Sequence, residues 1–292
     1  MLMETEKSPR AFIVRRLIRV APLYFLATTF VATVSWSLPW LRASGSSPTA
    51  GEYVFSILFL PYIAADGSMT PVLFPGWTLN YEMMFYVCCT IALCWRSASG
   101  SYVATIAVVA WCGAAHLLVP HTTVGRFYAN PIILEFIFGV LIWRLHSRLQ
   151  HNFAGTLWNL ALLGLIISMA AAEKYIPIKA ALPADWARPL VQGLIASAAV
   201  YICFAANSAF LKLSNKIRCS MLVVGNASYS IYLAHASVIA LMNLVLPKFG
   251  VAGASSNLGS LLALAFCVLF GIAIDRFIDA PVQRKLRSTL HV

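Results

Sequence analysis

Long apolar runs dominate the chain, and they constrain its fold more than any motif does. A transmembrane helix needs about 20 predominantly apolar residues, and eight runs approach that length. Only 11% of the 292 residues are charged, against about 25% in soluble domains. The sequence therefore excludes a soluble enzyme and predicts an all-α polytopic membrane helix bundle, formed by a single domain over residues 1–292. The predicted spans are 17–38, 77–95, 101–119, 131–146, 157–172, 188–206, 220–246 and 258–278.

A further apolar run, residues 53–63, is too short to cross the bilayer. We expect it to lie at the membrane interface or to re-enter the membrane from one side, because about 20 residues are needed to span.

Positive residues outnumber negative ones, with 21 Lys and Arg against 10 Asp and Glu. In a soluble protein this excess would favour nucleic acid as a partner. In a membrane protein Lys and Arg collect in cytoplasmic loops, and most of them fall on one side when the N-terminus is cytoplasmic. The distribution predicts two cytoplasmic termini, an even number of spans, and contact with membrane lipids, not nucleic acid.

The seven cysteines form no C-x-x-C pair, and nearly all of them lie in or beside apolar runs. This placement favours small core residues over a disulfide framework or a zinc site. We expect no metal.

Three arginines stand at the start of the first predicted span: Arg15, Arg16 and Arg19. Arg15 and Arg19 are four residues apart, so they share one helix face. Guanidinium groups bind phosphates well, which suggests the phosphates of a nucleotide-bearing cofactor. The alternative is a topology signal that contacts lipid headgroups, and spacing alone favours that alternative.

Glu82 lies about one and a half turns inside an otherwise apolar helix, in the segment from Pro75 to Tyr86. A carboxyl group at that depth must meet a cation, donate as a neutral acid or line a wet cavity. It is therefore either a group that orients substrate or transfers protons, or a structural partner of an arginine. Asn80, Tyr81 and Tyr86 offer hydrogen-bond partners nearby.

A second polar stripe is expected in the segment from Gly225 to His235, where Ser228, Tyr232 and His235 share one helix face. Such a stripe suggests a polar lumen, in which His235 serves either as a base or as a structural hydrogen-bond partner. Glu135 is interpreted as another buried carboxylate, and His116 as a weaker candidate. The last group, Asp275, Arg276, Asp279 and Arg284, is interpreted as i, i+4 pairs that anchor a helix terminus at the cytoplasmic face.

Several of these segments resemble the acyltransferase-3 family of integral membrane acyltransferases. Phe12–Tyr24 resembles the family's arginine motif, and Trp77–Tyr86 resembles its Trp-x-Leu-x-x-Glu-x-x-Phe-Tyr motif, with wording closest to the exopolysaccharide acetyltransferase branch. Asn130–Gly139 and Gly225–His235 resemble two further blocks. Asp279-Ala280-Pro281 stands where members often carry Glu-x-Pro, so Asp replaces Glu.

The resemblance implies transfer of an acyl group, usually acetyl from acetyl-CoA, to a hydroxyl of a cell-envelope, lipid-linked or exported saccharide. It implies an enzyme of the bacterial inner membrane. Arg15, Arg16 and Arg19 would then bind the CoA phosphates, and Glu82 and His235 would be the catalytic candidates. The residues expected to contact substrate are Trp77, Asn80, Tyr81, Glu135 and Tyr232.

The resemblance also implies about ten spans, with two helices before the arginine motif and the catalytic histidine on the first of them. This chain starts a few residues before Arg15, so we expect an N-terminally truncated member. Two other hypotheses stay open from the residues alone. One is a non-catalytic membrane protein, a transporter-like or partner-binding bundle that uses the same polar lumen. The other is an unrelated acyltransferase with His235 as its base.

Overall fold

In the computed structural model every regular element among the described residues is a helix, as the sequence predicted. The described residues are 8–38, 47–94, 107–108, 110–111, 114, 117, 121–149, 192–205, 210, 213–251, 253 and 256–290. The chain divides into two compact units. One comprises Met1–Pro9 and Val87–Ser214, and the other comprises Arg10–Tyr86 and Asn215–Val292.

Three helices among the described residues are long and apolar enough to cross a membrane. They are Pro9–Ser37, Ser228–Phe249 and Asn257–Leu290. The first, α2, has 29 residues and contains Pro22 without breaking, which membrane helices tolerate when neighbouring groups satisfy the freed backbone carbonyl. The total of eight spans remains a prediction.

The short apolar run after α2 forms α3 (Ala50–Ile57), which runs antiparallel to the second half of α2. The Tyr53 hydroxyl lies 2.9 Å from Thr29 Oγ1. One turn further on, the Tyr24 hydroxyl donates to the Ser56 carbonyl oxygen at 3.1 Å. Thus α3 reaches only from the end of α2 to its middle, which confirms that this run is too short to span.

The following helix, α4 (Gly76–Cys94), begins beside Tyr24, in the middle of α2. A Cβ atom at Gly76 would lie 2.7 Å from Tyr24 Cε2, so only glycine permits this approach. The Tyr24 ring also stacks on Phe59, with 4.8 Å between the ring centroids. The connection from α3 to α4, residues 58–75, is buried mainly at its end, where Val72, Leu73 and Pro75 are covered, whereas Leu58, Leu60 and Phe74 are exposed.

The predicted span 220–246 is wrong as a single helix. It divides into α13 (Asn215–Asn226) and α14 (Ser228–Val245) at the fully buried Ala227. Asn226 and Ser228 flank this break, and Asn and Ser side chains compete with helical backbone hydrogen bonds. Only α14, continued by η4 (Leu246–Phe249), retains the properties of a span.

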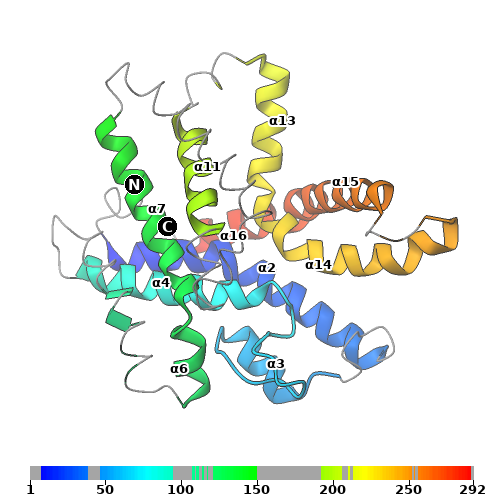
Figure 1. Ribbon diagram of the computed structural model, residues 1–292, viewed down its shortest axis with the longest axis horizontal. Coiled ribbons are helices and arrows are strands. Elements are labelled where there is room, and N and C mark those ends of the chain that lie inside the picture. Colours follow the sequence, from blue (N-terminus) through cyan, green and yellow to red (C-terminus); the bar gives the residue numbers. More distant parts are fainter. Residues whose placement is uncertain are drawn as a thin grey trace, which may run out of the picture. The chain divides into compact units, whose positions relative to one another are not determined.

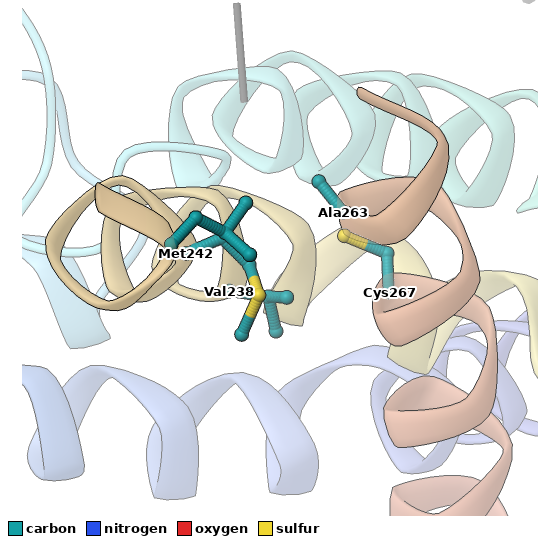
Figure 2. Packing of buried hydrophobic residues seen from close by; sticks show 5 residues of the cluster. Val238, Met242, Ala263 and Cys267 are labelled. Carbon is teal, nitrogen blue, oxygen red and sulfur yellow. The ribbon is translucent and has the colours of Figure 1, made fainter. Parts of the chain in front are cut away.

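Helix α15 (Asn257–Ile274) lies beside α14 (Figure 1). Figure 2 shows Val238 and Met242 of α14 facing Ala263 and Cys267 of α15, and all four side chains are buried. Further along the pair, a Cβ atom at Gly271 would lie 2.7 Å from the Ile231 Cα atom. The two backbones approach this closely because Gly271 has no side chain.

The last helix continues beyond the predicted span 258–278, through the π-helical η5 (Asp275–Asp279) into α16 (Ala280–Leu290). Pro281 has no backbone N–H and cannot make a regular helical hydrogen bond. The adjacent π turn accommodates it, and π turns inside helices are frequent at functional sites.

The other unit contains α6 (Thr123–Tyr128), η2 (Pro131–Leu134), α7 (Glu135–Leu149) and α11 (Gly193–Ala205), with α7 packed against α11. The apolar helices Pro131–Ile142 and Gly193–Cys203 are shorter than full spans. They correspond to the predictions for 131–146 and 188–206. The predicted span 157–172 and most of 101–119 lie outside the described residues.

Candidate active site

The three arginines of α2 do not share one environment. Arg15 and Arg19 are exposed, whereas Arg16 is partly buried. The exposed pair is spaced four residues apart, so the two guanidinium groups lie on one helix face. This face can meet an anionic ligand, while Arg16 points toward the interior of its unit.

Arg16 contacts two aromatic rings that also contact each other. Its guanidinium carbon is 5.5 Å from the centroid of the Phe12 ring and 5.4 Å from that of Tyr86. The two rings meet edge to face, with 6.2 Å between their centroids. Both aromatic side chains are buried, Phe12 at 4% exposure and Tyr86 at 8%. A cation–π contact contributes about 0.5–2 kcal/mol, and more as the cation is desolvated, so the two buried rings hold the partly buried Arg16 in place.

Glu82 is joined to the same cluster, because the Tyr86 hydroxyl donates a hydrogen bond to Glu82 Oε1. The two residues are one turn apart on α4. The arginine motif and the α4 carboxylate therefore form one connected group: Arg16, Tyr86 and Glu82. Glu82 is only partly buried, unlike Tyr86.

Tyr229 of α14 joins the group from a third helix. Its hydroxyl donates to the Val20 carbonyl oxygen at 2.6 Å, and Glu82 and Asp279 are both close enough to act on it electrostatically. This places α2, the first half of α4, α14 and η5 around one polar region.

Asp279 is the residue whose environment differs most from our interpretation. It is only 2% exposed, whereas Arg276 and Arg284 are exposed, and Arg284 Nε donates to the Ala280 carbonyl oxygen at 3.2 Å. Asp279 is thus not part of a surface i, i+4 pair. The cation that acts on it electrostatically is Arg19 of α2. The π turn of η5 rotates Asp279 inward, which a regular 3.6-residue period could not predict.

Tyr232 connects α14 to the start of α4. Its hydroxyl lies 2.5 Å from Thr78 Oγ1 and donates to the Pro75 carbonyl oxygen at 3.2 Å. This contact brings the predicted Trp77–Tyr86 and Gly225–His235 segments together, as a shared polar region requires.

His235 lies one turn beyond Tyr232 on α14 and bonds to its own helix. Its Nδ1 is 2.5 Å from the Tyr232 carbonyl oxygen. A carbonyl can only accept, so Nδ1 carries the proton and Nε2 of the neutral ring has a lone pair. Glu82 is near Tyr229 and His235 is beyond Tyr232, so the two lie on opposite sides of the Thr78–Tyr232 contact.

The remaining α4 candidates differ in access. Trp77 is partly exposed and meets the Tyr81 ring edge to face, with 6.2 Å between centroids. Asn80 and Tyr81 are buried, at 2% and 5% exposure. Trp77 is therefore the accessible one of the three, and the buried Tyr81 packs against its ring.

The prediction of a buried carboxylate at Glu135 is wrong. Glu135 is exposed and is the first residue of α7, where a negative charge interacts favourably with the positive end of the helix dipole. It belongs to the other unit. His116 lies outside the described residues.

Sequence reasoning missed the roles of Phe12, Thr78 and Tyr229 in this region. All three are uncharged, and their types are common in apolar helices. The only signals in the sequence are helical spacings: Phe12 stands four residues before Arg16, and Tyr229 stands three residues before Tyr232.

Helices of membrane length and a polar region that holds arginines and a carboxylate, both within the described part of the chain, are typical of an integral membrane protein. The family model described as "Acyltransferase domain" matches residues 1–276, and the chain belongs to this acyltransferase-3 family. It is an acyltransferase that does not transfer aminoacyl groups.

A curated relative supports the same assignment. The chain is 29% identical, over 300 residues, to the exopolysaccharide production protein ExoZ of Rhizobium meliloti strain 1021. The match covers 96% of this chain and 83% of that protein. No solved structure matches the chain significantly.

Proposed function

We propose that the protein transfers an acyl group, acetyl in the simplest case, from acyl-CoA to a hydroxyl of an exported saccharide. Family membership supports acyl transfer, and the name of the ExoZ relative supports an exopolysaccharide, free or lipid-linked, as the acceptor. We further propose eight spans, an inner-membrane location and two cytoplasmic termini, on the charge distribution of the sequence.

One observation carries the proposal: Tyr86 links the arginine motif of α2 to the Glu82 carboxylate. An acyl-CoA molecule has phosphates at one end and a reactive thioester at the other. Exposed arginines for the phosphates and a nearby carboxylate for the reacting end suit that arrangement. Arg15 and Arg19 are the exposed members of the arginine motif.

In the proposed reaction the acceptor hydroxyl oxygen attacks the thioester carbonyl carbon. A C–O bond forms, the C–S bond breaks, and the hydroxyl proton passes through a base to the departing thiolate, which leaves as free CoA. Glu82 binds the acceptor hydroxyl and orients it. The base is either Glu82 itself or, on the other side of the Thr78–Tyr232 contact, His235 through the lone pair of Nε2.

The test is acetyl transfer by the purified full-length chain from two donors that share the thioester. Acetyl-CoA carries phosphates, and S-acetyl-N-acetylcysteamine carries none. We expect Arg19→Ala to raise KM for acetyl-CoA by about tenfold, because one charge-assisted contact is lost. The same variant should leave KM for the short donor unchanged. An equal KM for acetyl-CoA in Arg19→Ala and the wild type would reject the proposed phosphate site. Labelling of the acceptor without consumption of acetyl-CoA would reject acyl-CoA as the donor.

A further inference from the structure

The three arginines of α2 are adjacent in sequence but have different surroundings. The planar guanidinium of Arg16 is held by the Phe12 and Tyr86 rings, at 5.5 and 5.4 Å. Arg15 and Arg19 are exposed. A phosphate-binding arginine needs its N–H groups directed at solvent or ligand, whereas the guanidinium of Arg16 is directed toward two buried rings that meet each other edge to face.

Tyr86 connects three other residues of the cluster. Its ring contacts the Arg16 guanidinium and meets the Phe12 ring at nearly a right angle, and its hydroxyl donates to Glu82 Oε1. At 8% exposure Tyr86 has little room to change rotamer. Whatever holds the Tyr86 ring therefore also fixes the direction of its O–H bond, and with it the orientation of the Glu82 carboxylate.

We propose that Arg16 is a positioning residue that acts on the Glu82 carboxylate through Tyr86, and that recognition of the donor phosphates falls to Arg15 and Arg19. This inference rests on the proposed function, since it divides the roles within that site. It differs from the sequence prediction, which gave all three arginines one role.

The two roles have different kinetic signatures. A phosphate contact acts before and during the reaction alike, so its loss raises KM and leaves kcat unchanged. A misaligned catalytic group slows the chemical step, so its loss lowers kcat. Residues that act as one unit are also non-additive, so the second substitution in such a pair adds little to the first.

The experiment measures initial rates of acetyl transfer by the full-length chain, at varied acetyl-CoA and saturating acceptor. Five single variants are compared, together with the double variant of the first two: Arg16→Gln, Tyr86→Phe, Arg16→Lys, Arg19→Gln and Arg10→Gln. Arg10 is the matched control, because it is an exposed arginine of the same helix outside the cluster.

We expect Arg16→Gln and Tyr86→Phe each to lower kcat by about tenfold or more, with KM for acetyl-CoA within about twofold of the wild-type value. The double variant should lose no more than the worse single one. Arg16→Lys should also lose kcat, since lysine keeps the charge but not the planar guanidinium that contacts both rings. Arg19→Gln should raise KM with kcat retained, and Arg10→Gln should change neither constant.

The inference is overturned if Arg16→Gln raises KM as Arg19→Gln does, or if the losses of Arg16→Gln and Tyr86→Phe multiply in the double variant. If Arg16→Gln fails to fold, Tyr86→Phe and Arg16→Lys decide the same question, because both preserve most of the packing. A wild-type chain that transfers nothing from acetyl-CoA would instead contradict the proposed function, which keeps the two failures distinct.

Discussion

Tyr232 and Thr78 lie 154 residues apart in sequence, yet their side-chain oxygens are 2.5 Å apart. The same Tyr232 hydroxyl donates to the Pro75 carbonyl oxygen. One side chain of α14 thereby fixes both the first turn of α4 and the end of the irregular segment before it. Because Glu82 lies one turn further along α4, we expect the position of its carboxylate to depend on this contact.

We predict that Tyr232→Phe lowers the free energy of unfolding by about 1 kcal/mol, because a partly buried hydrogen bond is lost while the ring is kept. Thermal unfolding of the detergent-solubilised chain measures it. Tyr53→Phe is the control, since it removes an exposed hydrogen bond to Thr29 and should cost less. Equal melting temperatures for Tyr232→Phe and the wild type would show that the contact does not hold α4.

Gly271→Ala should destabilise the pair of helices α14 and α15. The new Cβ atom would lie 2.7 Å from Ile231 Cα and 2.8 Å from Ile231 N. Backbone atoms cannot turn aside as a side chain would, so the helices must separate, at a cost of about 1–3 kcal/mol.

Gly225→Ala in α13 is the matched control for that change, because a Cβ atom there meets nothing within 4 Å. Alanine is the better helix former, so this variant should be neutral or slightly more stable. A Gly271→Ala protein as stable as Gly225→Ala would contradict the close packing of the two helices.

The sequence was sufficient for the helical class and for which segments carry polar chemistry, since apolar length and isolated charges are local properties. It could not predict the break at Ala227, because that residue is itself a good helix former. It also could not predict the burial of Asp279, which depends on a π turn, or the exposure of Glu135, which depends on where a helix begins. The contact between Arg16 and Tyr86 joins residues 70 positions apart, and only tertiary structure brings such residues together.

The affinity for acetyl-CoA should fall as salt rises, because Arg15 and Arg19 are exposed charges. Screening shortens the range of such charges from about 10 Å at 0.1 M salt to about 3 Å at 1 M. We expect KM for acetyl-CoA to rise several-fold over that range, and to rise less in the Arg19→Gln variant. A KM that does not respond to salt in either protein would argue against phosphate recognition by this helix face.

His235→Ala separates a catalytic from a structural imidazole. If Nε2 transfers the acceptor proton, the variant should lose kcat by about a hundredfold, the usual contribution of a general base. His235→Ala also loses the Nδ1 contact to the Tyr232 carbonyl, so unfolding of the same sample is measured in parallel. Full kcat in a folded His235→Ala protein would assign this residue a structural role alone.

The central claim is that Glu82 is part of the centre that moves an acyl group from CoA to a saccharide hydroxyl. The most direct measurement follows labelled acetyl from acetyl-CoA to the saccharide in a single turnover, in the wild type and in Glu82→Gln. Asp66→Asn is the control, because Asp66 accepts the Ser68 N–H in an exposed turn where asparagine serves as well. We predict a rate at least about a hundredfold lower in Glu82→Gln and an unchanged rate in Asp66→Asn. Equal rates of transfer in Glu82→Gln and the wild type would contradict the account.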